Sequence, residues 1–268
     1  MKVRLNKPDE LGRVFNRITI DKETGTVYLV GFGPGDPDLL TIKAVKALNN
    51  ADVIYYDDLI NKDYINRFEA EKIYVGKRKD RHSKDQEEIN RLLLKSATEV
   101  KNVVRLKGGD PMIFGHGGEE IAFLEKHHIK TEVIPGVSSG IAAAGLTKIP
   151  LTYRGVSSSV SFISGHNIKN MNIPKTGTLV FYMSVSTIRS IALKLIKEGW
   201  ESNTPAVVVY SVSNPDQEER FTTLNQLIYS EKVFKTPSII IVGEVVNLSC
   251  MSKKENRELL ERIKELSN

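Results

Sequence analysis

The sequence has few of the features that stabilise or anchor secreted and membrane proteins. It contains one cysteine, Cys250, so the chain cannot form an internal disulfide, which is typical of proteins in a reducing cytoplasm. No apolar run approaches the ~18 residues of a membrane span. The N-terminus is charged and is broken by Pro8, unlike a secretory signal. We therefore expect a cytoplasmic globular protein with no membrane partner.

Two common kinds of site are also missing from the sequence. A phosphate-binding loop needs Gly-Lys-Ser or Gly-Lys-Thr, but Gly76-Lys77 is followed by Arg78. The histidines do not have metal-ligand spacing with one another or with Cys250, so we predict no metal site. These histidines are His82, His116, His127, His128 and His166.

The composition allows a large hydrophobic core but does not indicate which kind of ligand the protein binds. The chain has 268 residues, of which 40% are hydrophobic, and this length permits one large or two medium domains. Its net charge of +5 is compatible with a polyanionic ligand, either nucleic acid or a polycarboxylate. The same charge is equally typical of lysines on a solvated surface, so it indicates no single function.

Strand-like and helical segments alternate along most of the chain, which predicts an α/β fold. We expect an N-terminal extension over residues 1–25, a first α/β domain over 26–136, a second over 137–250 and a C-terminal helix over 251–268. The expected strands lie near residues 27–32, 52–56, 72–75, 103–106, 131–134, 158–164, 178–183, 206–211 and 238–246. The expected helices lie near residues 39–48, 83–97, 118–126, 138–146, 188–198 and 224–229.

A glycine-rich block follows the apolar pair Val103-Val104. This block, Arg105-Leu-Lys-Gly-Gly-Asp-Pro-Met-Ile-Phe-Gly-His-Gly-Gly-Glu-Glu120, combines glycines, a proline and three carboxylates after a predicted strand. Glycine has no Cβ, so the backbone can approach a ligand closely there. Asp110 is placed to accept hydrogen bonds from a ribose. Glu119 and Glu120 are expected in the first turn of the next helix, where acids are favoured.

A second glycine-rich turn, Gly31-Phe-Gly-Pro-Gly-Asp36, follows the first predicted strand. Asp38 is a candidate N-cap for the next helix, whose apolar face we expect to contain residues 39, 42, 45 and 48. The turn fails as a dinucleotide motif, because Asp36 holds the last glycine position and Pro34 has no N–H for a phosphate. Its carboxylates suit a neutral or cationic ligand better than a pyrophosphate.

Together with four further motifs, these turns resemble those of the tetrapyrrole methylases. The similarity extends from about residue 27 to residue 246, and the block over residues 105–120 resembles the branch that methylates uroporphyrinogen III. The resemblance implies an α/β class III methyltransferase fold, in which two α/β domains hold S-adenosylmethionine in the cleft between them. The four motifs are Val133-Ile-Pro-Gly-Val-Ser-Ser139, Ile149-Pro-Leu-Thr-Tyr-Arg154, Ser164-Gly-His166 and Thr178-Leu-Val-Phe-Tyr-Met183.

The resemblance also implies which residues bind the cofactor, largely through backbone groups. Met183 has an alternative interpretation as a core methionine that ends a strand. His166 is expected either to line the tetrapyrrole cleft or to be an ordinary loop histidine. The matching cofactor positions are Pro34, Gly108, Gly109, Asp110, Ile113, Ser138, Ser139, Met183 and Val212.

Two residues are candidates for moving protons. Asp57 follows a predicted strand, and the residues alone support equally a catalytic carboxylate and a loop carboxylate that caps the next turn. The family pattern selects Asp57 over the adjacent Asp58 as proton acceptor, and it places a proton donor at Lys77. A lone lysine is otherwise a surface residue, and a donor role would require a pKa lowered by burial.

The resemblance implies methylation of uroporphyrinogen III at carbons 2 and 7, which gives precorrin-2 through precorrin-1 for sirohaem or cobalamin synthesis. It also implies a homodimer, for which the apolar stripe of Leu259, Leu260, Ile263 and Leu266 is a candidate surface. The alternatives are a later corrin-ring methylase, a ribosomal-RNA methylase and a non-catalytic module that binds the cofactor. We expect no nucleic-acid partner, because no basic stripe is interleaved with aromatic residues.

Overall fold

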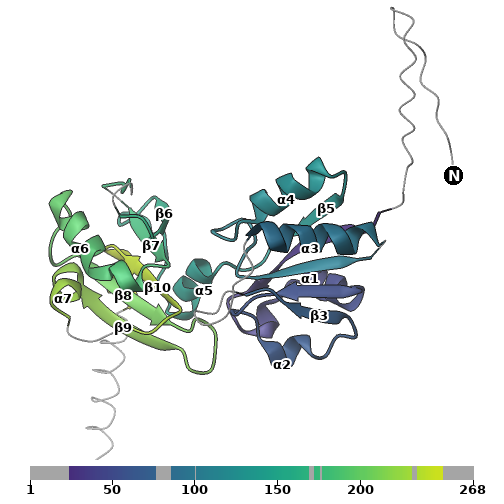
Figure 1. The fold of residues 1–268 in the computed structure, drawn as a ribbon. Helices are drawn as coiled ribbons and strands as arrows, with labels where there is room; N and C mark the ends of the chain where they lie inside the picture. Colours follow the sequence, from purple (N-terminus) through teal and green to yellow (C-terminus); the bar gives the residue numbers. More distant parts are fainter. Residues whose placement is uncertain are drawn as a thin grey trace, which may run out of the picture.

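The computed structural model describes residues 24–76, 86–99, 101–168, 172–175, 177–230 and 234–249. Within these ranges the chain forms two five-stranded sheets, each covered by helices, which confirms the predicted α/β class (Figure 1). Lys77, Cys250, the C-terminal helix predicted over residues 251–268 and most of the predicted N-terminal extension lie outside the described residues.

The first sheet is parallel throughout and has the strand order β3-β2-β4-β1-β5. The helices α1 (Ile42–Asn49) and α2 (Lys62–Ile65) cover one face, and α3 (Gln86–Thr98) and α4 (Gly117–Lys126) cover the other (Figure 1). The five strands are β1 (Thr26–Gly33), β2 (Val53–Tyr56), β3 (Glu71–Tyr74), β4 (Val103–Gly108) and β5 (Lys130–Ile134). Burial on both faces explains the near-continuous apolar runs of β1 and β2, whereas the edge strands β3 and β5 are partly exposed and contain polar residues.

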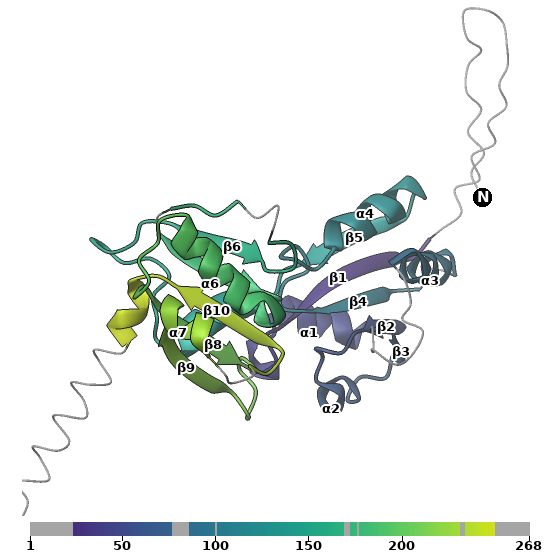
Figure 2. The same ribbon diagram turned by 60° about the vertical axis from the view of Figure 1, so that its left-hand side comes forward.

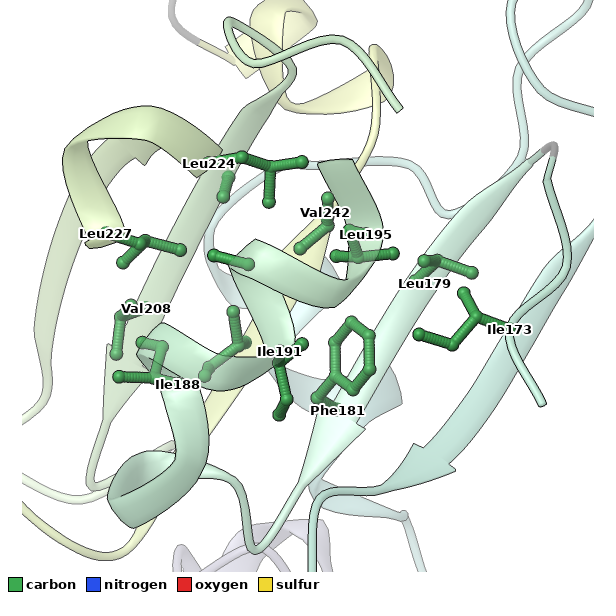
Figure 3. Close-up of a cluster of buried hydrophobic side chains, with 13 residues drawn as sticks. Ile173, Leu179, Phe181, Ile188, Ile191, Leu195, Val208, Leu224, Leu227 and Val242 are labelled. Carbon is green, nitrogen blue, oxygen red and sulfur yellow. The ribbon is translucent and has the colours of Figure 1, made fainter. Parts of the chain in front are cut away.

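The second sheet is mixed, with the order β6-β7-β10-β8-β9, and only the pairing of β6 with β7 is parallel. Its strands are β6 (Val160–Ser164), β7 (Thr178–Tyr182), β8 (Pro205–Tyr210), β9 (Glu218–Thr223) and β10 (Ser238–Val242). The helices α6 (Ile188–Lys197) and α7 (Leu224–Tyr229) cover one face. Figure 3 shows the apolar cluster they bury, in which Phe181 and Leu179 of β7 meet Ile191 and Leu195 of α6.

Helix α5 (Ser139–Leu146) lies between the two sheets in Figure 1, and Figure 2 shows the same two sheets side by side from a second direction. Its small residues allow a close approach to the second sheet, where Ala142 and Ala143 pack against Val180 and Val207. On the other side, the backbones after β1 and β5 are in contact, because a Cβ at Gly31 would lie 2.5 Å from the nitrogen of Gly136. Glycine is therefore needed at this crossing for packing, independently of any ligand.

Most predicted elements are present, with boundaries that differ by one or two residues, but three expectations are wrong. The last strand ends at Val242 and not at Val246, since Gly243 adopts a φ of 140° and residues 245–249 are helical. Strand β9 was not predicted, because its sequence, Glu-Glu-Arg-Phe-Thr-Thr, has little apolar character and the strand is only partly buried. The start and the buried face of α1 also differ.

Helix α1 begins at Ile42, and its N-cap is Thr41, whose Oγ1 accepts the Ala44 N–H at 3.1 Å. Asp38 therefore does not cap it and instead lies in a short 3₁₀ helix (Pro37–Leu39), which Asp36 caps. The buried residues of α1 are Ala44 and Leu48, whereas Ile42 is 78% exposed. The buried face thus follows an i, i+4 spacing through Ala44 and Leu48, whereas the prediction had followed an i, i+3 spacing.

None of the helices in the described part of the chain is long and apolar enough to cross a membrane.

Candidate functional site

A cavity of about 830 Å³ is lined by residues of both sheets. This volume falls within the ~300–1,000 Å³ typical of small-molecule sites. The first sheet contributes the turns that follow β1, β2 and β4, so the cavity lies at the carboxyl edge of that sheet, where α/β sheets bind ligands. Six predicted cofactor residues line it: Pro34, Gly108, Gly109, Ser139, Met183 and Val212.

Gly108 ends β4 and faces the loop after β2. A Cβ at Gly108 would lie 2.8 Å from the Cβ of Leu59, a cavity-lining side chain that is 57% exposed. The next residue, Gly109, has a φ of 68°, and its N–H donates to the Gly33 carbonyl at 2.7 Å. The glycine pair thus joins the β1 and β4 turns and leaves room for Leu59 at the cavity wall.

Asp110 has a structural role that the sequence did not predict. Its Oδ1 accepts the Met112 N–H at 2.8 Å, and its Oδ2 accepts the Gly136 N–H at 3.0 Å. The carboxylate therefore holds the β4 turn against the end of β5. Asp110 and Ile113 are not among the cavity-lining residues, so their contact with a cofactor stays a prediction.

On the second sheet, the turns after β7 and β8 reach the cavity through strained backbone. Met183 and Ser211 have φ values of 52° and 50°, a region that side-chain-bearing residues seldom adopt. Met183 is 42% exposed, so the alternative interpretation as a core methionine is wrong. Val212 is buried in the core of the second sheet and also lines the cavity. Strain of this kind is often found at functional sites.

The hydroxyl of Tyr182 organises the start of α5. Its oxygen accepts the Gly140 N–H at 3.0 Å and lies 2.7 Å from the Oγ of Ser138, which does not itself line the cavity. Burial raises the pKa of Tyr182, although both hydrogen bonds act to lower it. The tyrosine thus stays neutral, and its hydroxyl holds Ser138 and positions the adjacent Ser139 at the cavity wall.

The ionisable groups of the cavity wall favour a cation over an anion. Asp58, Asp216 and His166 line it, and none of the lining residues in the described part of the chain is lysine or arginine. The Ser211 Oγ donates to Asp216 at 2.6 Å, and this hydrogen bond lowers the pKa of Asp216. The described residues also contain no group of three or more histidine, cysteine or carboxylate side chains that would hold a metal ion.

Asp57 directly follows β2, as predicted, but the lining residue is its neighbour Asp58. The Oδ1 of Asp57 accepts the Leu59 N–H at 3.3 Å, and its Oδ2 lies 3.6 Å from the Nη2 of Arg105. The side chain therefore caps the next turn and also pairs with a buried cation, so its catalytic role stays a prediction. Lys77, the predicted proton donor, lies outside the described residues.

Behind Asp57, three charged side chains are buried between β4 and α4. Glu120 accepts from Lys107 at 3.0 Å and from the Nε of Arg105 at 3.3 Å. Glu119 and Glu120 do lie in the first turn of α4, as predicted, but Glu120 is completely buried in an ion pair. Burial, and next the charge of Arg105, lower the pKa of Lys107, while Glu120 and Asp57 act in the opposite direction.

Sequence reasoning missed several cavity residues. Tyr182, Ser211 and Asp216 gave no signal, because hydroxyl and carboxyl groups without glycine or a repeated spacing are typical of any loop. His166 does line the cavity, one of the two outcomes expected for it. The positive φ of Ser211 depends on tertiary packing, which no local pattern encodes.

Comparisons with known proteins agree with this geometry. A family model described as Tetrapyrrole (Corrin/Porphyrin) Methylases matches residues 26–228. The chain is similar to a uroporphyrinogen-III C-methyltransferase of Bacillus subtilis (strain 168), with 46% identity over 237 residues, which covers 83% of this chain and 91% of that protein. A siroheme synthase of Nitrosomonas europaea (strain ATCC 19718 / CIP 103999 / KCTC 2705 / NBRC 14298) is 41% identical over 251 residues, which covers 90% of this chain and 53% of that protein.

The fold is similar to that of a solved enzyme with a ligand. The crystal structure of uroporphyrin-III C-methyl transferase from Thermus thermophilus complexed with S-adenyl homocysteine has a TM-score of 0.74 and 39% sequence identity. The match covers 84% of this chain and 100% of that chain.

Proposed function

The chain belongs to the tetrapyrrole methylase family, and on that premise we propose that it transfers methyl groups from S-adenosylmethionine to uroporphyrinogen III. The methyl groups go to carbons 2 and 7, so that the product is precorrin-2, formed through precorrin-1. Identity of 46% to a uroporphyrinogen-III C-methyltransferase over nearly its whole length supports this substrate over a later corrin-ring intermediate.

The observation that carries the proposal is the cavity between the two sheets. Its wall contains Asp58 and Asp216 but, among the lining residues of the described chain, no lysine or arginine. This fits a ligand with a cationic sulfonium better than a nucleoside phosphate. When bound, S-adenosylmethionine supplies a methyl group that its positive sulfur already activates. The protein's main task is then to orient the two reactants, which can remove roughly 7–11 kcal/mol of the barrier.

The residues of the chain that handle protons are Asp57 and Lys77. We propose that Asp57 accepts the proton released from the methylated ring and that Lys77 donates one. Asp57 directly follows β2 and precedes the cavity-lining residues Asp58 and Leu59. Its side chain is 26% exposed, so solvent reaches it on one side. The Nη2 of Arg105 lies 3.6 Å from the Oδ2 of Asp57, so the carboxylate is paired with a cation on its buried side.

The setting of the reaction is also part of the proposal. The similarity to a siroheme synthase favours a place in sirohaem synthesis, with cobalamin synthesis as the other use of the same product. We propose a cytoplasmic homodimer without nucleic-acid or membrane partners. The apolar stripe considered for the dimer lies outside the described residues, so sedimentation decides the point. A monomer of 30.0 kDa at micromolar concentration would contradict the dimer.

Labelled methyl transfer tests the proposed substrate. The purified chain is incubated with S-adenosylmethionine carrying a labelled methyl group and, in parallel, with uroporphyrinogen III, a later corrin-ring intermediate or ribosomal RNA. We expect label only in the tetrapyrrole reaction with uroporphyrinogen III. Label in RNA that disappears as salt rises would support the RNA alternative, because phosphate contacts are screened by salt.

A further inference from the structure

Strand β4 carries charge on a face that is otherwise apolar. Alternate residues of a strand point to the same side, so Val103, Arg105 and Lys107 share one face. Val103 belongs to the apolar cluster under α3 and α4, whereas Arg105 and Lys107 are each only 4% exposed. The charges occupy the end of the strand nearest the cavity, and Lys107 directly precedes the lining residue Gly108.

One carboxylate oxygen of Glu120 accepts hydrogen bonds from three side chains. The Oε1 of Glu120 accepts from Lys107 at 3.0 Å, from Arg105 at 3.3 Å and from the Nε2 of Gln86 at 3.1 Å. Its Oε2 has no hydrogen-bond partner among the described residues. Arg105 also extends to Asp57, since its Nη2 lies 3.6 Å from the Oδ2 of that residue.

The four groups balance in charge, with two cations and two anions, and they reach solvent mainly at one end. The side chain of Asp57 is 26% exposed, whereas those of Arg105 and Glu120 are 5% and 0% exposed. Burying an ion costs several kcal/mol even when it is paired, and apolar residues of similar volume often stabilise a fold better. Stability alone therefore does not account for the network, whereas control of the exposed Asp57 would.

Resting on the proposed function, in which Asp57 accepts a proton, we propose that Lys107 and Glu120 are positioning residues that set the ionisation of Asp57 through Arg105. Glu120 holds the guanidinium in the orientation that faces Asp57, together with the carbonyl oxygens of Leu106 and Tyr55. Lys107 offsets the negative charge of Glu120, so that the positive charge of Arg105 remains available to the Asp57 carboxylate.

The sign of the effect follows from charge. Without Lys107, Arg105 is the one cation left between two carboxylates, so the site becomes more negative and the pKa of Asp57 rises. Without both Lys107 and Glu120, one cation and one anion remain, so the pKa returns toward the wild-type value. Among the described residues, the other ionisable groups near this end of the sheet include Asp58 and Tyr74, which are hydrogen bonded to each other at 2.5 Å. Tyr56 and Lys62 also lie against the Tyr74 ring, and neither variant alters any of these groups.

The experiment measures the ionisation of Asp57 directly. The carboxyl carbon of Asp57 is followed by NMR against pH in protein with labelled aspartate, and the signal is assigned by its loss in Asp57→Asn. We expect Lys107→Met to raise the midpoint of the Asp57 titration by roughly half a pH unit. This shift is smaller than the ~1–3 units caused by a charge in direct contact, because Lys107 acts through Glu120 and Arg105. The double variant Lys107→Met/Glu120→Gln should bring the midpoint back toward that of the wild type.

Controls separate this effect from damage to the fold. Lys126→Met removes a lysine from the exposed side of α4, where solvent screens the charge, and should leave the midpoint unchanged. If Lys107→Met alone folds poorly, the double variant still tests the proposal, because the double variant leaves no unpaired buried charge. An Asp57 titration midpoint far from the wild-type value in the double variant would contradict the charge balance. An unchanged midpoint in folded Lys107→Met would overturn the proposal outright.

The same variants distinguish this inference from the proposed function. The acid limb of the methylation rate against pH should move with the NMR midpoint, upward in Lys107→Met and back in the double variant. A wild-type protein that does not methylate uroporphyrinogen III would refute the proposed function, while the NMR titration would still decide whether the network controls Asp57. A limb that stays fixed while the NMR midpoint moves would show that Asp57 is not the proton acceptor.

Discussion

The two sheets differ in the charged side chains that they bury behind the cavity wall. Every buried charged residue of the described chain, Arg105, Lys107 and Glu120, belongs to the first sheet and its helices. The core of the second sheet buries only apolar and uncharged polar side chains and reaches the cavity through turns such as those at Met183 and Ser211. Among the described residues, charge is thus buried only behind the first-sheet side of the cavity, whereas turns of both sheets line it. Substitutions of the charged residues and of the turn residues should therefore affect different measurements.

The largest effect is expected at Asp57. Asp57→Asn keeps the shape of the side chain but removes its negative charge, so turnover should fall by roughly 10²–10⁴-fold, as for a positioned base. Affinity for S-adenosylhomocysteine, measured by calorimetry, should stay close to that of the wild type. Lys77→Met should behave in the same way.

Asp63→Asn is the matched control, because Asp63 is an exposed carboxylate in the first turn of α2. It should leave both turnover and affinity unchanged. Parallel loss of binding and turnover in Asp57→Asn would break the comparison between charged residues and turn residues, because the Asp57 carboxylate would then also hold the cofactor.

The next effect is on cofactor binding at Gly108. The branched side chain of Gly108→Val would collide with Leu59 and push it into the cavity, so affinity for S-adenosylhomocysteine should fall by about tenfold or more, given the ~1–3 kcal/mol of overpacking. Leu59→Ala in the same protein should restore part of the affinity, because it removes the displaced side chain. Calorimetry on folded protein measures both.

Gly118 provides the comparison for Gly108. It lies in α4, and a Cβ added there would meet no atom within 4 Å, so Gly118→Ala should leave the affinity unchanged. If Gly108→Val binds the cofactor normally, the β4 turn is not part of the cofactor site.

A smaller effect is expected on the second sheet at Tyr182. Tyr182→Phe leaves the Gly140 N–H and the Ser138 hydroxyl without their partner, which costs ~1–3 kcal/mol for an unsatisfied buried group. The ring still packs against Phe114 and Phe162. We expect a raised KM for S-adenosylmethionine with kcat nearly unchanged in steady-state kinetics, whereas a fall in kcat alone would contradict a purely positioning role.

The smallest effect is a change in stability with pH. Because the pKa of Lys107 is lowered in the folded protein, the folded state releases that proton before the unfolded chain does. The free energy of unfolding therefore gains a contribution as pH rises from the lowered pKa toward the ordinary value of 10.5, and lacks it at lower pH. Lys107→Met should lose this gain. Urea unfolding of both proteins across the alkaline range measures the difference, and identical pH slopes would show that the lysine is not perturbed.

The sequence predicted the elements whose signals are local. The alternation of strands and helices was sufficient to place most of both sheets, and the resemblance to the tetrapyrrole methylases supplied six residues of the cavity wall. The start of α1 was misplaced, because Pro37 and Asp38 form a separate 3₁₀ turn before Thr41 caps the helix. Two valid capping signals in succession cannot be ranked without knowing how the chain packs.

The charges and hydroxyl groups of the site could not be predicted in the same way. Glu120 was expected in the first turn of α4, where it lies, but its burial depends on how that helix packs over Arg105 and Lys107. Asp110 was expected to face a ribose, yet its carboxylate holds Met112 and Gly136. These roles arise from contacts between segments far apart in sequence, which a linear pattern does not contain.

The mass of the tetrapyrrole product tests the account most directly. Wild-type protein is incubated with uroporphyrinogen III and an excess of S-adenosylmethionine, and the number of added methyl groups is read from the intact mass of the product. We predict that two methyl groups are added, with a singly methylated species appearing first and then declining. A product that never gains a methyl group, from protein that binds S-adenosylhomocysteine, would contradict the assignment of uroporphyrinogen III as substrate.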